Sequence, residues 1–598
     1  MNASKNVVAS TLERWLKLLA VSSLLALASC TPIDAPQQVM AAEPTFAEFS
    51  HNFLEAYWQL EPEAALYNGR YEFADQMQIP DQAYRDQVTA FVDAQRDLLA
   101  QFDPATLSNS DAGDYAIIAN QLDSMLWYQD TFKLHTWNPA SYNIASVIGL
   151  ILNTDYTDLE VRLLQIGKRL DRASAYYQAA EEAIDRPALP YTELAIQQTA
   201  GVIGFLKTEL AEAIAESTLP DDGKQKLNAS NLKAQQAAQG YLDFLNGLLP
   251  QLKAGDARDF RIGETLYEQK FQLDINAGYT AKQMYQLALE DKAQLHQKMA
   301  ALADQLWAKY YPNQTPPADA MQKVRMVLDR IADSHADADA FVEEVREQIP
   351  QLTQFVVDHD LIDVDPEKPL VVREAPEYLR GFAVAFISAP GPYDTQANTY
   401  YSVNPPQYYP PEQQESYLRE YNDYTLQIIN IHEAVPGHYT QLVHSNKSPS
   451  LIKAIFGNGA MVEGWAVYTE RMMLEEGYGN DSPELWLMYY KWNLRTVCNT
   501  ILDYSTQVLG MDEEAALDLL INQAFQERTE ALGKWRRATI SQVQLTSYFT
   551  GYKAIYSFRD AQRAQQGEAF DLKQFHNRFL SYGSAPIPLI IAAMQATQ

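Results

Sequence analysis

Cysteine is nearly absent from the sequence, which has only Cys30 and Cys498 among 598 residues. Cys30 ends an apolar stretch near the N-terminus, so one cysteine remains for the body of the chain. A single thiol cannot form an intramolecular disulfide, and we expect a hydrophobic core to hold the fold together. Because Cys498 lies in a helical-looking stretch, we expect a buried structural thiol rather than a nucleophile.

Basic residues are also scarce: 46 Lys and Arg stand against 77 Asp and Glu, for a net charge of -31. Such a chain is repelled by nucleic-acid phosphates and by anionic lipid headgroups. The sequence has no run of Lys or Arg that would offset this repulsion locally. We therefore expect no nucleic-acid partner, and we interpret the acidity as a contribution to solubility.

Long apolar runs are missing outside the first 30 residues. Residues 1–17 carry three basic side chains and one acidic one, and an apolar stretch over residues 18–28 follows. This stretch is too short to span a bilayer as a mature helix, and its order of regions is typical of a cleaved targeting signal. We expect no membrane-spanning segment in the mature chain.

The apolar stretch ends in Leu27-Ala28-Ser29-Cys30, which resembles the lipobox of bacterial lipoproteins. The resemblance implies a signal peptide over 1–29, a Cys30 that is diacylated and becomes the new N-terminus, and a tether over 30–45. Thr31, in place of Asp, implies the outer membrane of a Gram-negative bacterium. The alternative is a plain secretory peptide with an incidental cysteine. We expect a soluble body whose contact with the membrane is the lipid anchor only.

From residue 46 onward, apolar residues recur at spacings of three and four, which is typical of amphipathic helices. Thr280 is a candidate N-cap for a long helix that runs to about residue 308. We expect a mainly α fold over 46–598, and its division into two lobes, 46–275 and 276–598, stays open. The periodic segments begin with Phe46, Phe49, Phe53 and Tyr57 and continue over 85–101, 111–130, 157–185, 190–217 and 223–250.

One region has the character of β-structure. Residues 370–372, 382–387 and 399–403 are short apolar segments separated by proline and glycine turns, and they predict a small sheet. If the last segment is an exposed edge strand, Tyr401 and Asn404 beside it would contact an extended peptide substrate. The alternative is a small structural sheet that binds no ligand.

The segment after this sheet contains His432-Glu433-Ala434-Val435-Pro436-Gly437-His438. In the zincin motif His-Glu-x-x-His, the histidines lie four apart on one helical face and bind Zn²⁺, while the glutamate takes a proton from water. A spacing of six would set them about 120° apart on an ideal helix. Because proline disfavours helix at the preceding residue and glycine permits unusual dihedrals, we expect a bulged turn that restores their convergence.

A third ligand is expected at Glu463, 25 residues after His438 in the apolar, helical-looking segment 459–470. A carboxylate there is costly to bury unless it is paired or bound to a metal. Glu470 falls on nearly the same face, and we expect it to support a ligand. His444 is the nearby substitute for His438, but we expect a surface histidine there. The nitrogen and oxygen ligands favour zinc and leave other divalent ions open.

These motifs, His-Glu-x-x-Pro-Gly-His followed by Glu463-Gly-Trp-Ala-x-Tyr-x-Glu470, resemble the bacterial family known as domain of unknown function 885. That family is grouped with gluzincin-like metallopeptidases. The resemblance covers roughly 46–595, and many members have a second histidine where this chain has Tyr439. Further matching segments are Gly278-Tyr279-Thr280-Ala281, Gln544-x-x-Ser547-Tyr548-x-x-Gly551 and Tyr582-Gly583-Ser584-x-Pro586.

The resemblance implies a large helical zincin-like fold with a small sheet beside the active-site cleft. It implies His432, His438 and Glu463 as zinc ligands and Glu433 as the general base. Similar zincins stabilise the oxyanion with a residue of a late helix, and Tyr548 is the candidate here. Tyr552, Tyr556 and Arg559 follow on the same side of that helix and would assist. The alternative is a tyrosine stripe that belongs to the core.

Together these observations predict a zinc-dependent hydrolase whose substrate is a peptide or a small amide. Cleavage of another amide or an ester bond would use the same water-activating chemistry. The alternative from a different class is a non-catalytic lipoprotein that binds peptides or envelope components. The sequence predicts neither the oligomeric state nor whether cleavage is terminal or internal.

Overall fold

The computed structural model describes residues 44–368, 370–375, 384–394 and 398–596. The predicted signal peptide, Cys30 and nearly all of the tether lie outside these residues, so those predictions stay open. The residues from Phe46 onward belong to one compact unit. Helices dominate this unit, which confirms the mainly α fold expected from the sequence. No helix among the described residues is long and apolar enough to cross a membrane.

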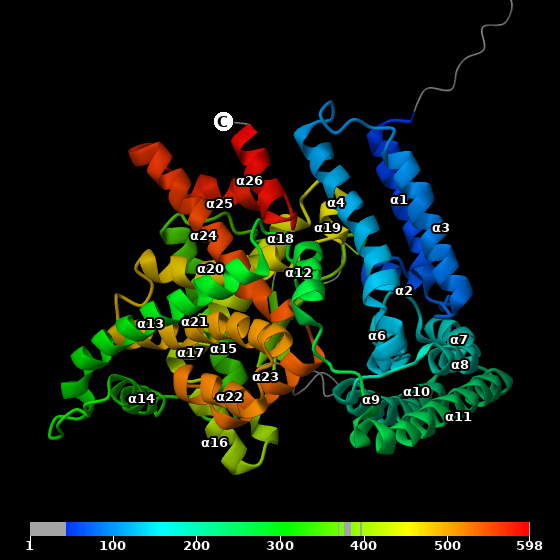
Figure 1. Ribbon diagram of the computed structural model, residues 1–598, viewed down its shortest axis with the longest axis horizontal. Coiled ribbons are helices and arrows are strands. Elements are labelled where there is room, and N and C mark those ends of the chain that lie inside the picture. The colour runs from blue at the N-terminus through cyan, green and yellow to red at the C-terminus, as the bar shows by residue number, and fades with distance from the viewer. Residues whose placement is uncertain (1–43, 369, 376–383, 395–397, 597–598) are drawn as a thin grey trace, which may run out of the picture. The chain divides into compact units, whose positions relative to one another are not determined.

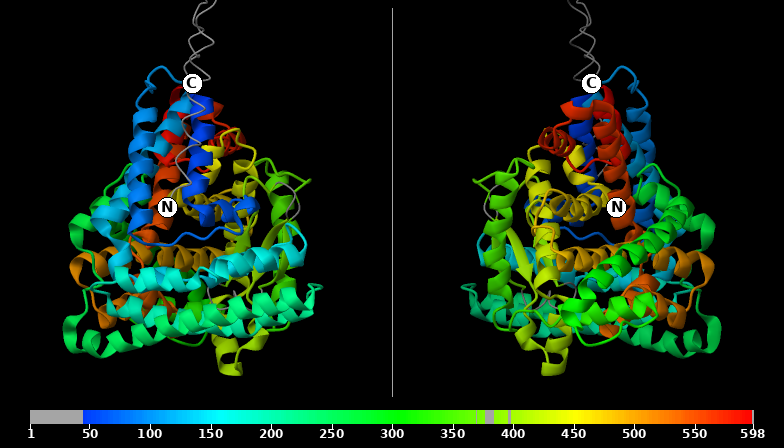
Figure 2. Two further views of the ribbon diagram at one scale, coloured as in Figure 1. Left: turned by 90° about the vertical axis from the view of Figure 1, so that its right-hand side faces the viewer. Right: turned by 90° about the vertical axis from the view of Figure 1, so that its left-hand side faces the viewer.

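The first helices form an antiparallel group. Helices α1, α3 and α4 lie side by side (Figures 1 and 2), and their apolar faces join the larger of two hydrophobic clusters through Phe53 and Ile118. The elements of this part are α1 (Phe46–Leu60), α2 (Pro62–Tyr67), α3 (Gln82–Leu99), α4 (Asn109–Leu126) and α5 (Leu134–Trp137).

The next helices pack around the second hydrophobic cluster, which includes Leu163, Ile203 and Tyr241. The periodic stretches 157–185 and 190–217 each prove to be two helices, interrupted at Asp171–Arg172 and at Thr208. The elements are α6 (Ala145–Asn153), α7 (Leu159–Leu170), α8 (Ala173–Ala183), α9 (Leu189–Lys207), α10 (Glu209–Glu216) and α11 (Asp221–Gln251). The expected division of the chain into two lobes stays a prediction.

Thr280 caps a long helix, as expected. Its hydroxyl accepts a hydrogen bond from the Gln283 amide, and the Gln283 side chain accepts one from the Thr280 amide, which is a complete capping box. The helices of this region are α12 (Gly263–Asp274), α13 (Ala281–Tyr310), α14 (Ala320–Ile331) and α15 (Phe341–Asp358).

The predicted sheet is present, with strands β1 (Leu370–Glu374), β2 (Ala385–Ser388) and β3 (Thr399–Val403). Their order is β1-β3-β2, with β1 parallel and β2 antiparallel to β3. The expectation that 399–403 is an exposed edge is therefore wrong, because β3 is hydrogen-bonded on both sides and has no free backbone edge to offer a peptide.

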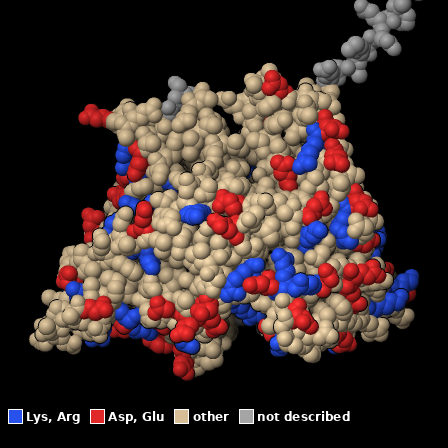
Figure 3. Space-filling view, viewed as in Figure 1, with Lys and Arg blue, Asp and Glu red and all other residues tan. Residues whose placement is uncertain are grey.

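Helices resume after the sheet and run to the end of the described chain. On the face shown in Figure 3, basic side chains are interspersed with acidic ones. Cys498, on α21, is fully buried, as expected of a structural thiol. The helices are α16 (Pro411–Glu420), α17 (Asp423–Glu433), α18 (His438–Ser445), α19 (Leu451–Ile455), α20 (Gly459–Glu475), α21 (Pro483–Tyr504), α22 (Glu513–Leu517), α23 (Arg528–Ile540), α24 (Ser547–Gln566), α25 (Leu572–Leu580) and α26 (Ile587–Ala596).

Candidate metal centre

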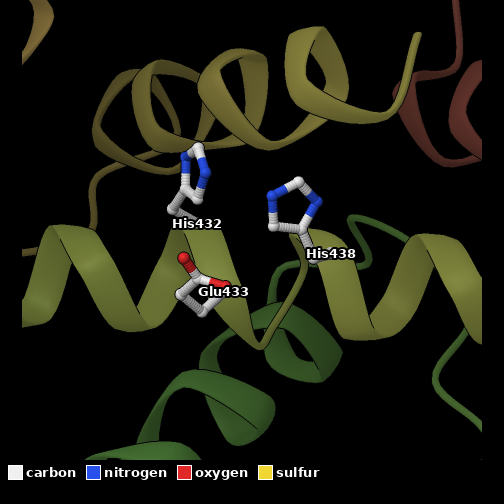
Figure 4. Close-up of side chains that lie close together, drawn as sticks. All are labelled: His432, Glu433 and His438. Carbon is white, nitrogen blue, oxygen red and sulfur yellow. The ribbon is translucent and has the colours of Figure 1, made fainter. Parts of the chain in front are cut away.

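The two histidines of the motif lie on different helices. Helix α17 ends at Glu433 and α18 begins at His438, so the chain breaks between them instead of bulging within one helix (Figure 4). The Gly437 amide donates to the carbonyl of Ile431 at 3.0 Å. A Cβ on Gly437 would lie 1.8 Å from the His432 carbonyl oxygen, so only glycine fits this return of the chain.

The break brings the two imidazoles together. The sequence predicted this convergence but expected a bulged turn to produce it. Their ring centroids are 4.7 Å apart and their planes are nearly perpendicular. One ligand atom each of His432, Glu433 and His438 lies within 4.8 Å of the other two. The Oε2 atom of Glu463 lies 3.7 Å from Nε2 of His432 and 3.4 Å from Nε2 of His438.

The donor set fits a zinc ion. Zinc binds nitrogen and oxygen at about 2.0–2.2 Å, so two ligand atoms of a tetrahedral site lie roughly 3.3 Å apart. Both distances from Oε2 of Glu463 to the histidine Nε2 atoms are close to this separation. Oε2 of Glu463 is buried and makes no hydrogen bond with any described residue. A buried carboxylate oxygen without a hydrogen bond is costly, and a cation between these three groups would remove that cost.

Glu470 holds His432 in place. Nδ1 of His432 lies 2.7 Å from Oε1 of Glu470, and the indole N–H of Trp492 donates to the same oxygen at 3.1 Å. A hydrogen bond at Nδ1 directs Nε2 toward Glu463 and His438, the arrangement by which carboxylates orient histidine ligands of metals. Trp492 could not be predicted from the sequence, because its approach depends on the packing of α21 against α17 and α20.

The carboxylates around His432 favour its protonated form. Burial lowers the pKa of His432, but the nearby carboxylates of Glu463 and Glu470 outweigh it and raise the pKa to about 10. Burial raises the pKa of Glu463, yet the two histidines hold it well below its usual range. Proton binding and cation binding at these groups therefore compete.

Glu433 has the properties of a base rather than those of a paired carboxylate. Burial raises its pKa, the two histidines lower it, and the charges of Glu463 and Glu470 raise it again, so that the net shift is upward. A carboxylate with a raised pKa binds a proton more readily near neutral pH, as a general base requires. Figure 4 shows its side chain next to both imidazoles.

Helix α24 approaches this site closely because two glycines face each other. A Cβ on Gly464 would lie 2.3 Å from the Gly551 carbonyl carbon, and one on Gly551 would lie 1.7 Å from the Ala460 carbonyl oxygen. Tyr548 is one turn before Gly551. Burial and the negative charge of Glu463 raise the pKa of Tyr548 to about 12, so its hydroxyl stays protonated at neutral pH.

The other residues of the tyrosine stripe join a separate ion-pair cluster. The Tyr552 hydroxyl accepts from Nη1 of Arg471 at 2.9 Å, and the Tyr556 hydroxyl donates to Glu475 at 2.6 Å. Nη1 of Arg559 lies 3.0 Å from Oε2 of Glu475. These contacts are made further along α20 and α24, and none of them involves a histidine of the metal motif.

Tyr401 joins the sheet to the helix that carries the first histidine. Its buried hydroxyl donates to Oδ1 of Asn430, on α17, at 2.7 Å. Asn404 is also buried, and its backbone amide donates to the Val384 carbonyl. Whether either residue contacts a substrate stays a prediction.

His444 and Tyr439 make their hydrogen bonds away from the cluster of His432, His438 and Glu463. Nε2 of His444 lies 2.9 Å from the Asp363 carbonyl oxygen, so the ring is occupied elsewhere. The hydroxyl of Tyr439 donates to the Lys368 carbonyl. His438 is therefore the second histidine that faces Glu463.

Comparisons with known proteins agree with the resemblance seen in the motifs. A family model described as "Bacterial protein of unknown function (DUF885)" matches residues 62–594. A solved structure of a candidate lipoprotein of unknown function from Shewanella oneidensis is 51% identical, covering 92% of this chain and 100% of that one with a TM-score of 0.86.

A second solved structure, of a candidate lipoprotein from Colwellia psychrerythraea, is 16% identical. It covers 92% of this chain and 98% of that one with a TM-score of 0.74, which shows a shared fold. No protein with a curated description matches the chain.

Proposed function

This chain belongs to the DUF885 family of bacterial proteins, and we propose that it is a zinc-dependent hydrolase that cleaves peptide bonds. The observation that carries the proposal is Oε2 of Glu463. It is buried, makes no hydrogen bond with the described residues, and lies within 3.7 Å of Nε2 of both His432 and His438. An oxygen and two nitrogens that converge in this way form the ligand set of many catalytic zinc sites.

In this proposal His432, His438 and Glu463 hold the metal, and Glu470 orients His432. The zinc ion supplies Lewis-acid polarisation of the attacking water and of the scissile carbonyl. Glu433 accepts a proton from the water and delivers it to the leaving amine. The protonated hydroxyl of Tyr548 donates a hydrogen bond to the oxygen that becomes negative during attack.

We further propose that the protein is a lipid-anchored component of the cell envelope. The sequence around Cys30 resembles a lipobox, and both similar solved structures are of candidate lipoproteins. Thr31 then favours the outer membrane. An anchored hydrolase of this kind would act on peptides that reach the envelope, and an anchor alone would join it to the membrane.

The first experiment measures zinc by mass spectrometry in protein purified without a metal-affinity tag. We expect near-stoichiometric zinc in the parent and in Glu476→Ala, a control directly after the end of the same helix, and its loss in Glu463→Ala. Absence of zinc from the parent, even after incubation with zinc, would contradict the proposal and favour a non-catalytic binding lipoprotein.

The second experiment follows cleavage of a synthetic peptide library. We expect Glu433→Gln to keep its zinc and to lose about 10²–10⁴-fold in rate, because the glutamine amide cannot accept the proton of the water. A zinc-loaded Glu433→Gln variant with the parental rate would show that Glu433 is not the base. Ester and small-amide substrates, tested beside the peptides, decide which bond the site prefers.

A further inference from the structure

A positively charged side chain lies beside Tyr548 and forms no ion pair with a described residue. Nη2 of Arg537, on α23, donates to Oε1 of Gln544 at 2.6 Å and lies 3.5 Å from the Tyr548 hydroxyl. Within the described residues, no carboxylate oxygen lies within ion-pair distance of this guanidinium, and the side chain is exposed. Its neighbour Arg536 turns elsewhere and donates to Gln197.

The segment between Arg537 and Tyr548 is held in a fixed conformation. Val543 is buried and has φ 71°, a left-handed value that a β-branched residue rarely adopts. The buried carboxylate of Asp503 accepts hydrogen bonds from the amides of Val543 and Leu545 at 3.1 and 3.2 Å. These hydrogen bonds hold the backbone in its strained conformation, so Gln544 and Tyr548 keep their places relative to α23.

Tyr548 thus lies beside a cation and within electrostatic range of Glu463. Burial and the negative charge of Glu463 raise the pKa of its hydroxyl, and Nη2 of Arg537 lies 3.5 Å from that hydroxyl. Glu433, Glu463 and Glu470 make the surroundings of the histidines acidic and would repel a substrate carboxylate. Arg537 offsets that repulsion at one position, and its planar guanidinium matches a carboxylate with two parallel hydrogen bonds.

We propose that Arg537, oriented by Gln544, binds the C-terminal carboxylate of the peptide substrate. This inference rests on the proposed function and adds a substrate class to it. A peptide carbonyl beside Tyr548 would have its chain end near Arg537, because one residue of extended chain spans only about 3.3–3.6 Å. The site then removes residues from the C-terminal end of peptides rather than cutting them internally.

Binding tests the inference without turnover. The full-length Glu433→Gln protein, loaded with zinc, is titrated with dansylated random pentapeptides that end in a free carboxylate or in a carboxamide, and dansyl anisotropy is followed. We expect the free carboxylates to bind about tenfold to a hundredfold more tightly, the range for hydrogen bonds between charged groups. Arg537→Gln in this background should abolish the preference, Arg537→Lys should retain part of it, and Arg536→Gln, the matched control, should keep it.

Several outcomes would overturn the inference. A preference that survives in Arg537→Gln, with unchanged zinc content and circular dichroism, would show that another group binds the chain end. Equal binding of carboxylates and carboxamides by the Glu433→Gln protein would show that the site ignores the chain end. Carboxamides that end in Asp and bind as tightly as free carboxylates would show recognition of an acidic side chain instead.

Failure of the proposed function has a different signature. Zinc content and cleavage are measured separately from anisotropy, so a protein without zinc or hydrolysis would contradict the hydrolase. If such a protein still preferred free carboxylates through Arg537, the carboxylate site would stand as part of a peptide-binding lipoprotein. If it bound neither peptide mixture, both the hydrolase and the carboxylate site would be refuted.

Discussion

Helix α20 carries two glutamates with opposite surroundings, Glu463 near its start and Glu475 at its end. Glu475 has a full set of partners: Arg471 at 2.7 Å, Arg559 at 3.0 Å and the hydroxyl of Tyr556. Among the described residues, Glu463 has ion-pair contacts with the imidazoles of His432 and His438, and its Oε2 makes no hydrogen bond with them. The side chains are similarly accessible, 24% exposed for Glu475 and 22% for Glu463.

The difference separates a carboxylate whose partners are ion pairs within the fold from one that we propose binds a metal. Arginine keeps its charge at every physiological pH, so the partners of Glu475 are permanent. Histidine is neutral or charged according to pH, and when neutral it offers a lone pair to a metal. Burial alone would not distinguish the two glutamates, whereas the chemistry of their partners does.

The largest effect that would sharpen this comparison is expected at Arg559, which is 1% exposed. Arg559→Met removes a buried partner of Glu475 and should lower the free energy of unfolding by about 3 kcal/mol, while zinc content stays unchanged. Urea denaturation and metal analysis measure the two quantities. Arg563→Met is the control, because its ion pair with Glu476 is exposed and long, at 3.8 Å, and should contribute less than about 1 kcal/mol. Loss of zinc in Arg559→Met would erase the distinction between the two ends of α20.

A smaller effect is expected from pH on the zinc-free protein. The folded pKa of His432, about 10, is above its unfolded value of about 6.5, so its stabilisation is complete below pH 6.5 and declines as pH rises toward 10. Between pH 6.5 and 8.5 the loss should be about 2 kcal/mol by urea denaturation. Glu433, Glu463, Glu470 and His438 are the titratable groups that face the ring.

Two variants isolate this pH effect. His432→Gln should lack that part of the slope, whereas Arg559→Met should show the parental slope, since arginine does not titrate in this range. If the parent and His432→Gln lost stability in parallel from pH 6.5 to 8.5, the charge on His432 would not be what stabilises the metal-free site.

The smallest effect is expected at Glu470, which lies between Glu463 and Glu475 on α20. Glu470→Gln keeps an oxygen that accepts from Trp492 and His432 but removes the negative charge, so the dissociation constant for zinc should rise about tenfold. Competition with a zinc-binding dye measures it, and Glu476→Gln should leave it unchanged. An unaltered constant in Glu470→Gln would mean that the hydrogen bond, and not the charge, is what Glu470 contributes.

Much of the fold could be predicted from local patterns. The apolar periodicity located the helices from Phe46 onward, and the capping box at Thr280 fixed the start of α13. The interruptions at Asp171–Arg172 and Thr208 escaped prediction, because both lie in sequence that supports helix and the chain turns there to pack around the second hydrophobic cluster. The order of the strands could not be predicted either, since the pattern of residues along a strand shows neither which strands it pairs with nor which strands lie at the edges of the sheet.

The candidate site was predictable where its residues are close in sequence. The motif from His432 to His438 and the acid on an apolar helix were sufficient to bring the two histidines and Glu463 together in a prediction. Trp492 and Arg537 were not predictable, since each reaches the site through helix packing that no spacing encodes. The expected bulge became a break between helices because Gly437 returns to the Ile431 carbonyl instead of continuing the turn.

The contact between Gly464 and Gly551 has a consequence for motion. Where helices are separated by side chains, they slide past one another by small rotamer adjustments, which is how shear movements proceed. At this crossing, backbone meets backbone and no such layer exists. Sliding of α20 along α24 would press backbone against backbone, so this crossing opposes relative movement of the helices that carry Glu463 and Tyr548.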